Sequence, residues 1–411
     1  MSRDLVRSAI RWTDAVFLED RPAAPAGRRI VAVLPGEGIG PEVVAAALRV
    51  LSAVEASCAG VEFDVRTGGA IGRDAELLSG RALTDEVVDF CADAFAAGGA
   101  ILSGPGGNRF VYDLRRRFDL FCKLSPLRPL QPLREASRLR ATAVAGTDVL
   151  IVRENSGGVY QGEWRETAGR EGRVCEHSFR YTETQVRRLL EVAARLAAGR
   201  SGRLCVVVKD GGIPTVTALW RDVGREIADR AGVGATFVDV DLAGYRLIQE
   251  PQTFDVIAAP NLFGDVLADL GAVLLGSRGM SFSGNFSSSG GAVYQTNHGS
   301  AHDLAGAGRA NPIGQIASAA MMLRESFGMG REAALVERAV DEVLRMGFRT
   351  FDVAEPGTTV VGTAELAERI ATEVERIASD PVERPASNGV ERAASNPEVE
   401  RIAGEPDRLP G

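Results

Sequence analysis

The chain has 411 residues, an apolar fraction of 45% and a net charge of −8. This length allows two domains with packed cores, and the acidic balance argues against nucleic acid or a membrane surface as a partner. No apolar run approaches the length of a membrane span, and residues 1–28 lack the apolar centre of a signal peptide. Five widely spaced cysteines without a CxxC pair predict a reduced, cytoplasmic protein.

The first predicted elements alternate between strand and helix. Residues 1–28 end in a Pro/Ala/Gly stretch and are predicted to be an extension outside the fold. A strand, IVAVLPG, then leads through a glycine-rich turn into a helix that begins near Pro41. The glycines at 36, 38 and 40 do not have the GxGxxG spacing of a Rossmann fold. The alternation continues to about residue 105 and predicts an α/β sheet.

The basic residues have an unusual composition. Lys123 and Lys209 are the only two lysines among the 47 basic residues, and all others are arginines. The bias toward alanine, arginine and glycine suggests a GC-rich genome in which arginine replaces lysine wherever charge alone is needed. A lysine that persists could therefore do what arginine cannot, such as change its protonation state.

Residues 254–271 combine a buried strand with a helix that carries two acids. Asp265 and Asp269 are four residues apart, so both carboxylates point off one face of the helix. A further acid, Asp241, follows another strand-like run and opens another helical pattern. Two carboxylates on one face and a third from a neighbouring element suit Mg²⁺ or Mn²⁺. The alternative is that acids in the first turns of a helix complement its dipole.

The segment NLFGDVLADLG resembles the metal-binding segment of the decarboxylating β-hydroxyacid dehydrogenases, which include isopropylmalate and isocitrate dehydrogenases. The likeness runs from about Ile30 to Glu375, and GEGIGPEVV resembles the opening motif of that family. It implies a two-domain α/β fold that is not Rossmann. Residues 29–122 plus 276–376 would form a discontinuous cofactor domain, and residues 123–275 a substrate, metal and dimerisation domain. The Pro/Glu/Ala/Ser-rich residues 377–411 are expected to be a disordered tail.

Residues 103–128 resemble the substrate-arginine segment of the family, whose pattern is close to LRxxxxLFANLRP. Arg115 matches the first arginine, and a guanidinium fork suits a carboxylate. Ser125 stands at the place of the second arginine, and Lys123 stands where the family usually has Asn. Either Lys123 or Arg128 could supply the missing charge. The alternative is that the three successive arginines at 115–117 form a solvated basic face.

Further substrate contacts are implied by the same resemblance. Val111 and Tyr112 stand where the family distinguishes the variable side group of the substrate. In residues 148–164, a buried strand ends in Arg153 and a glycine-rich turn leads to Tyr160. The resemblance implies that Arg153 binds substrate and that Tyr160 protonates the enolate. A tyrosine after two glycines is otherwise more often a packed hairpin residue.

The segment VVVKDGGIP departs from the family pattern DKANV. Counting back from Trp220 places Asp210 at the catalytic lysine position and Lys209 at the position of the neighbouring acid. In the family, the lysine helps to take the proton from the 2-hydroxyl of the substrate. Neighbours on a strand point to opposite faces, but the two glycines that follow could let the backbone re-aim Lys209. The scarcity of lysine favours Lys209 as the base; the rival interpretation is that Asp210 occupies the site and the proton chemistry is altered or lost.

Residues 277–297 are rich in glycine and serine and are predicted to be a flexible, exposed loop. The run that follows, HGSAHDLAGAGRANP, resembles the cofactor loop HGSAPDIAGKGIANP of the family. The resemblance implies that NAD is bound by His298, Gly299, Ser300, Ala301, Asp303 and Asn311, with Gln295 in place of a glutamate. A carboxylate at 303 would accept ribose hydroxyls and repel the extra phosphate of NADP. On its own, a histidine such as His298 is more often satisfied within its loop than a ligand contact.

These features together predict oxidative decarboxylation of a C3-substituted malate with NAD and Mg²⁺ or Mn²⁺. The changed arginine and lysine motifs argue against isopropylmalate or isocitrate and favour a variant enzyme of specialised metabolism. The resemblance also implies a homodimer, clasped by an arm at 156–182, in which the equivalents of Tyr160, Lys209 and Asp241 come from the partner subunit. The alternatives are a 2-hydroxy acid dehydrogenase that does not decarboxylate and a non-catalytic regulatory subunit.

Overall fold

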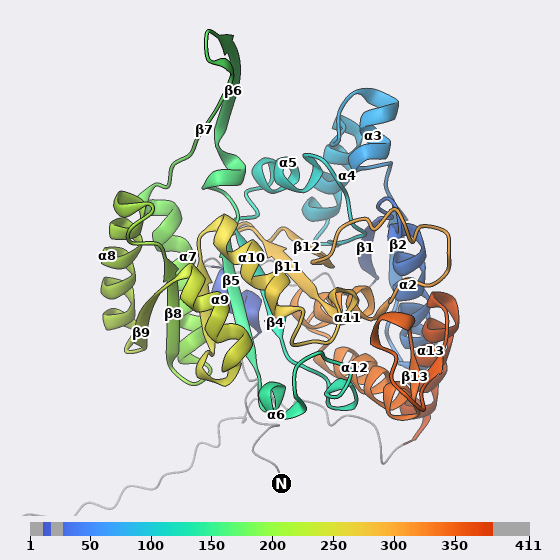
Figure 1. Ribbon diagram of the computed structural model, residues 1–411. Coiled ribbons are helices and arrows are strands. Elements are labelled where there is room, and N and C mark those ends of the chain that lie inside the picture. The colour runs from blue at the N-terminus through green and yellow to red at the C-terminus, as the bar shows by residue number, and fades with distance from the viewer. Residues whose placement is uncertain (1–10, 18–27, 381–411) are drawn as a thin grey trace, which may run out of the picture.

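The computed structural model describes residues 11–17 and 28–380, and a ten-stranded sheet crosses this part of the chain (Figure 1). Its strand order is β2-β1-β3-β12-β11-β4-β5-β10-β8-β9. The strands are β1 (Arg29–Leu34), β2 (Phe63–Thr67), β3 (Ala100–Ser103), β4 (Cys122–Leu127), β5 (Val149–Glu154), β8 (Arg203–Val208), β9 (Gly234–Asp239), β10 (Val256–Ala259), β11 (Phe282–Phe286) and β12 (Ala292–Thr296). The pairs β12–β11, β11–β4 and β4–β5 are antiparallel, and all other neighbouring strands of this sheet are parallel. The predicted division between two domains would fall between β11 and β4, in this antiparallel centre.

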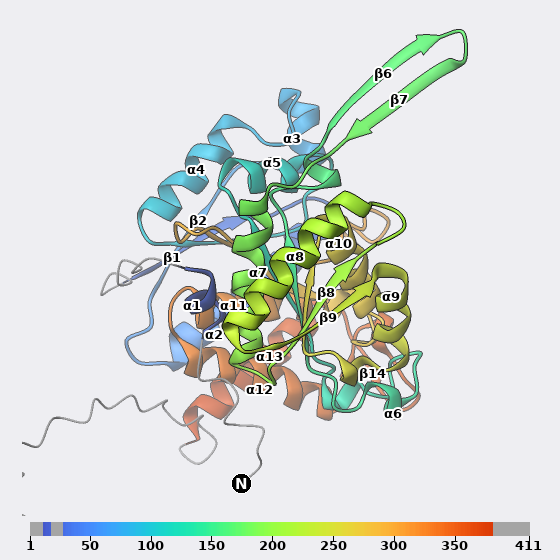
Figure 2. The same ribbon diagram turned by 90° about the vertical axis from the view of Figure 1, so that its left-hand side faces the viewer.

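Helices cover both faces of the sheet (Figures 1 and 2). They are α1 (Trp12–Val16), α2 (Gly40–Ser57), α3 (Gly72–Ser79), α4 (Asp85–Ala96), α5 (Phe110–Arg117), α6 (Ala141–Val144), α7 (Glu183–Ala198), α8 (Pro214–Ala231), α9 (Val240–Gln249), α10 (Asn261–Gly271), α11 (Ile313–Glu325), α12 (Gly330–Arg345) and α13 (Thr363–Ser379). Val31 and Val33 of β1 join the core that contains α2 and α11, whereas Ala32 and Leu34 join the core that contains α4 and α5. This alternation follows from the two-residue period of a strand.

The predicted two-stranded arm is confirmed. Strands β6 (Glu163–Gly169) and β7 (Gly172–Ser178) pair antiparallel, and every residue of both strands is exposed. Figure 2 shows the hairpin extending far from the body of the molecule. An isolated two-stranded hairpin is at best marginally stable in water. A smaller pair, β13 (Phe348–Arg349) and β14 (Thr359–Val360), lies beside α12.

The prediction of a flexible, exposed loop at 277–297 is wrong. Strands β11 and β12 occupy about half of this segment and lie inside the large sheet. Its small polar residues are buried because their hydrogen bonds are made within the sheet: Ser283 donates to the backbone oxygen of Gln295 at 3.1 Å, and Asn155 donates to Asn285 at 3.0 Å. At Gly284, a Cβ atom would lie 2.5 Å from the ring of Phe286, so the close packing requires glycine.

The predicted ends of the fold also need correction. Helix α1 lies within the expected extension, yet Thr13, Ala15 and Val16 are buried, and the Thr13 amide donates to Glu325 at 3.1 Å. Residues 11–17 therefore belong to the fold. At the other end, α13 continues to Ser379, and residues 381–411 of the expected tail lie outside the described residues. In the described ranges, no helix combines the length and apolar character that a membrane span requires.

Candidate active site

Three cationic side chains are buried together where α5, β4 and β5 meet. Arg115, Lys123 and Arg153 are 4%, 4% and 2% exposed. Lys123 and Arg153 are direct partners in the antiparallel pairing of β4 with β5. Arg128 is exposed, so Lys123 is the residue that brings a charge to the position of the missing arginine. Ser125 is buried on the same face of β4, two residues along.

Arg153 is held by the start of α10. Its Nε and Nη2 donate to Oδ1 of Asn261 at 3.1 and 2.8 Å, and its Nη1 pairs with Asp265. The Asn261 amide group donates in turn to the backbone oxygen of Gly157 at 2.8 Å. The sequence analysis did not single out Asn261, although its place at the break between strand and helix is a signal of a helix start.

Tyr160 joins this cluster from within the same chain. It lies in the 3₁₀ turn Val159–Gln161, and its ring centroid is 5.7 Å from the guanidinium carbon of Arg153, which pairs with Asp265. The expectation that Tyr160 would come from a partner subunit is therefore corrected. Burial and the nearby Asp265 raise the pKa of Tyr160. Burial would also raise the pKa of Asp265, but the charges of Arg153 and Lys123 outweigh it and lower that pKa.

Within the described residues, Arg115 and Lys123 form no ion pair, and the nearby acid Asp265 already pairs with Arg153. No hydrogen bond or ion pair of either cationic group occurs within the described residues, although both side chains are buried. Burial, and then the charge of Arg153, lowers the pKa of Arg115 to about 9. Burial and the two arginines lower the pKa of Lys123 well below its usual value. Buried charges without a partner are costly, so this cluster is suited to an anionic ligand.

The side-group residues border the same cluster. Val111 and Tyr112 are half-buried on α5. The ring of Tyr112 lies 5.1 Å from that of Tyr160 and 5.8 Å from the Arg115 guanidinium carbon. Arg109, which the sequence analysis did not single out, donates to the backbone oxygen of Tyr160 at 3.1 Å and so links α5 to that turn.

The displaced lysine belongs to a second cluster. Lys209, directly after β8, lies with its ammonium nitrogen 2.6 Å from Asp241 and 3.5 Å from Asp239. The hydrogen bond from Lys209 to Asp241 raises the pKa of the lysine and lowers that of the acid. Asp210 instead pairs with Arg221, which lowers the pKa of Asp210. Each of the two rival base candidates therefore already has its own partner.

The three predicted metal ligands do not assemble within one chain. Asp265 pairs with Arg153, Asp269 lies 2.9 Å from Arg278, and Asp241 belongs to the Lys209 cluster. In the part of the chain that the structure describes, no three acidic, histidine or cysteine side chains are grouped closely enough to hold a metal ion. Oxygen ligands of this type fit Mg²⁺ or Mn²⁺, but the set is complete only if a second chain supplies one of them.

The predicted cofactor loop is fixed to the glycine-rich turn after β1. The Ser300 hydroxyl donates to the buried carboxylate of Glu37 at 2.7 Å, and the Ser300 carbonyl accepts from Ile39 at 2.9 Å. His302, in place of the family proline, lies 3.3 Å from the same carboxylate. Glu37 was not predicted; an acid between two glycines that turn with positive φ, Gly36 and Gly38, was the available signal.

The predicted cofactor loop leaves a ring nitrogen and a carboxylate without partners among the described residues. Nδ1 of His298 contacts the Gly299 oxygen at 2.9 Å, whereas its Nε2 is buried without a hydrogen-bond partner. Burial lowers the pKa of His298, which favours the neutral ring. A Cβ at Gly299 would meet nothing within 4 Å, and Asp303 is exposed. Ala301 adopts a positive φ of 40°, which shapes the turn between them.

Two other predicted cofactor residues have internal roles. The Asn311 amide donates to Asp352 at 3.1 Å, and its oxygen accepts from Ile313 at 3.0 Å, so this side chain shapes the start of α11. Gln295 lies in β12, is 9% exposed and pairs with Ser103 and Ser283 of the neighbouring strands.

The α/β fold and the cluster of buried cations beside Asp265 agree with the class of α/β proteins that the sequence motifs resemble. Residues 30–370 match the family described as isocitrate/isopropylmalate dehydrogenase, and the chain belongs to this family.

Its relatives include the 3-isopropylmalate dehydrogenases of Desulfitobacterium hafniense, 39% identical over 83% of this chain and 98% of that protein, and of Aquifex aeolicus, 36% identical over 84% and 97%. Among solved structures, isocitrate dehydrogenase from Methylococcus capsulatus is similar with a TM-score of 0.74 and 31% identity, covering 84% of this chain and 99% of that one.

Proposed function

We propose that this protein oxidises a C3-substituted malate with NAD and decarboxylates the product, as a variant enzyme of specialised metabolism. The observation that carries the proposal is the pair of buried basic side chains, Arg115 and Lys123, that form no ion pair within the described residues, where Asp265 is already paired with Arg153. A small acid with two carboxylates would supply the missing negative charge. The relatives are named for dehydrogenases of such acids.

The chain's own residues account for binding and proton transfer. Arg115, Lys123 and Arg153 would hold the substrate carboxylates, and a lysine in place of an arginine gives a compact point charge instead of a planar fork. Ser125, which donates to Asn297 at 3.4 Å, leaves room where the family has a long side chain. This difference supports a substrate other than isopropylmalate or isocitrate. Lys209 would accept the hydroxyl proton, and Tyr160, whose pKa is raised, would hold a proton ready to donate to the enolate.

A divalent cation would be held by Asp265 and Asp269 of one chain and Asp241 of another. When bound, such an ion stabilises negative charge that develops on substrate oxygens. NAD, the hydride acceptor, would lie against the loop of His298 to Asp303. The exposed carboxylate of Asp303 supports a preference for NAD over NADP, because it would repel a phosphate at the ribose.

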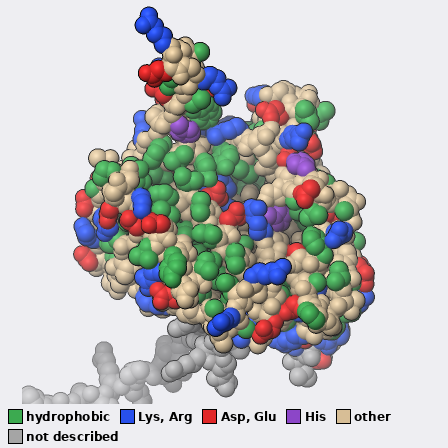
Figure 3. Space-filling model, viewed as in Figure 1, with side chains coloured by type: hydrophobic (Ala, Val, Ile, Leu, Met, Phe, Trp, Pro, Cys, Tyr) green, Lys and Arg blue, Asp and Glu red, His purple; other side chains and the backbone are tan. Residues whose placement is uncertain are grey.

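A homodimer would join the two clusters. Exposed apolar side chains gather on α9 and α10, the helices that carry the three acids, on the face seen in Figure 3. They are Leu242 and Tyr245 of α9, Val266 and Leu270 of α10, and Val273, which follows α10; all are between 37% and 66% exposed. A contiguous exposed apolar patch is typical of a protein interface, and the exposed arm would clasp the second chain.

The test is NADH formation by the purified protein with Mn²⁺ across malates that carry alkyl, carboxyalkyl or phosphonoalkyl groups at C3, with release of CO₂ measured alongside. Turnover of one of these acids with equal amounts of NADH and CO₂ would establish the proposal. NADH without CO₂ would indicate a dehydrogenase that does not decarboxylate. Efficient turnover of isopropylmalate alone would contradict the proposal of a different substrate. NAD binding without any turnover would favour a regulatory subunit.

A further inference from the structure

The turn that separates Arg153 from Tyr160 is intrinsically pliable. Residues 155–159 include Gly157 and Gly158, and Gly158 adopts a φ of 72° that other residues rarely reach. Arg153 ends a buried strand and is further held by Asn261. Tyr160 follows the two glycines, and it is also held by Arg109, which donates to its backbone oxygen at 3.1 Å, so the turn is one of the supports of its position.

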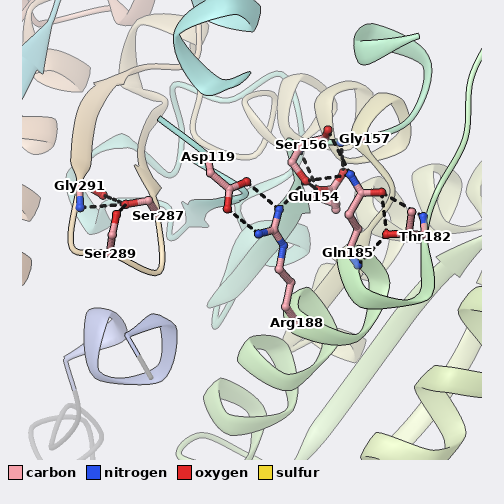
Figure 4. A network of polar contacts seen from close by, with 10 residues as sticks. All are labelled: Asp119, Glu154, Ser156, Gly157, Thr182, Gln185, Arg188, Ser287, Ser289 and Gly291. Carbon is pink, nitrogen blue, oxygen red and sulfur yellow. Dashed lines mark hydrogen bonds and ion pairs between the residues drawn. The ribbon is translucent and has the colours of Figure 1, made fainter. Parts of the chain in front are cut away.

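Glu154 fixes the turn from inside. Its fully buried carboxylate accepts from the Ser156 amide at 2.7 Å, from the Gly157 amide at 2.8 Å and from the Ser156 hydroxyl (Figure 4). These hydrogen bonds fix the first half of the turn, but their acceptor, Glu154, is the residue at which the turn begins. They do not relate the turn to the rest of the molecule.

From outside, the turn is held by several side chains, among them Asn261, which donates to the Gly157 oxygen at 2.8 Å, and two residues of α7: Gln185, which donates to the Ser156 backbone oxygen at 3.3 Å, and Arg188. The Nη2 of Arg188 donates to the Ser156 hydroxyl at 2.7 Å, and its two terminal nitrogens pair with Asp119 at 2.6 and 2.8 Å (Figure 4). The guanidinium also lies 4.3 Å from the ring centroid of Phe121. Asp119 follows α5, the helix that carries Arg115 and Tyr112. One guanidinium therefore joins the Tyr160 turn to the segment beyond the substrate-binding helix.

We propose that Arg188 is a positioning residue that sets the place of Tyr160 relative to the buried cations on α5 and β4. The proposal rests on the proposed function, since it assigns Arg188 to the step that Tyr160 would perform. Helix α5 does not need this tie for its own placement, because Phe110 and Leu114 anchor it in the core. The flexible partner in the contact is the turn.

Because the turn, and not helix α5, would move when Arg188 is lost, the kinetic effect of its replacement can be predicted. Loss of Arg188 would leave Arg115, Lys123 and Arg153 in place, so the KM of the substrate should change by less than about threefold. A misplaced proton donor slows the chemical step, and kcat should fall about tenfold or more. A merely structural role would lower the melting temperature without separating kcat from KM in this way.

The neighbouring residue supplies a matched control. Arg187 is on the same helix, is 28% exposed against 24% for Arg188, and also forms a forked ion pair, with Glu226. It makes no contact with the turn. We would compare Arg188→Gln, Arg187→Gln, Ser156→Ala and the double variant of Arg188 and Ser156, each by steady-state kinetics and by hydrogen exchange of residues 155–161.

The expected result is faster exchange of 155–161 and a lower kcat in Arg188→Gln, with Arg187→Gln behaving like the unmodified protein. Both Arg188→Gln and Ser156→Ala remove the contact between Arg188 and Ser156, and Ser156→Ala also removes the hydroxyl bond to Glu154, so their effects should be less than additive. Unchanged exchange in Arg188→Gln, or faster exchange with unchanged kcat, would overturn the proposal. If the protein turns over none of the acids, the proposed function fails, and the hydrogen exchange separately shows whether Arg188 fixes the turn.

Discussion

The ammonium nitrogen of Lys209 lies 2.6 Å from a carboxylate oxygen of Asp241, whereas the carboxylate of the next residue, Asp210, pairs with Arg221. Adjacent residues thus face different partners, and only Lys209 is joined to one of the predicted metal ligands. Lys209 is thus the base candidate that lies beside a predicted metal ligand, and its pKa is raised while it is paired with Asp241.

Replacement of the two candidates should separate them. Lys209→Ala is expected to lower kcat at least 100-fold, because general base catalysis typically contributes that much or more. Asp210→Ala should cost less than tenfold, since its carboxylate is engaged by Arg221 on the surface of α8. Steady-state kinetics with the best substrate would decide, and the opposite order of effects would assign the base to Asp210.

The separation of the two clusters predicts recovery of activity on mixing. Lys209→Ala and Asp265→Asn should each be inactive, because each removes one half of every site. In a mixed dimer, one site receives the intact Lys209 of one chain and the intact Asp265 of the other. Co-refolding the two variants in equal amounts should restore roughly a quarter of the original activity if subunits pair at random. No recovery, with mixed dimers demonstrated by mass spectrometry, would place the whole site in one chain.

Removal of the unpartnered lysine should stabilise the free protein. Lys123→Met keeps the length of the side chain but removes a buried amino group that forms no ion pair within the described residues. We expect the free energy of unfolding without ligand to rise by about 0.5–2 kcal/mol. The KM for the substrate should rise at the same time, because one carboxylate contact is lost. Urea unfolding with and without substrate tests both effects, and a destabilised apo protein would contradict the anion-binding role.

Glu325 predicts a pH dependence of stability. Burial raises the pKa of Glu325 from an ordinary 4.5 to about 7. The folded chain therefore holds this proton more tightly than the unfolded chain. Protonation of Glu325 contributes fully to the free energy of unfolding below about pH 4.5, and this contribution is lost as the pH rises to 7. Glu325→Gln, whose amide oxygen can still accept from Thr13, should remove up to about 3 kcal/mol of this dependence.

The difference in unfolding free energy between Glu325→Gln and the unmodified protein, measured from pH 4.5 to 8, is the test. The free energy of unfolding of the variant should increase relative to that of the unmodified protein as the pH rises. A constant difference across this range would show that Glu325 does not titrate there.

Local patterns predicted the helix that carries Asp265 and Asp269, the exposed hairpin at 156–182 and the strand that ends in Arg153, because each depends on short-range periodicity. The same reasoning gave a wrong prediction for the glycine- and serine-rich segment 277–297. Small polar residues usually mark loops, but here they are buried in β11 and β12, where strands distant in sequence satisfy their hydrogen bonds.

The sequence by itself determined the family, the α/β class and the residue types available for chemistry. Only the tertiary structure decided that Lys123 rather than Arg128 is buried beside Arg153, because the antiparallel pairing of β4 with β5 sets which side chains are opposed. It also placed Tyr160 beside Asp265 of its own chain and Lys209 beside Asp241, in two separate clusters. Burial and the pairing of charges over long sequence distances are properties of the packed chain, and no local pattern encodes them.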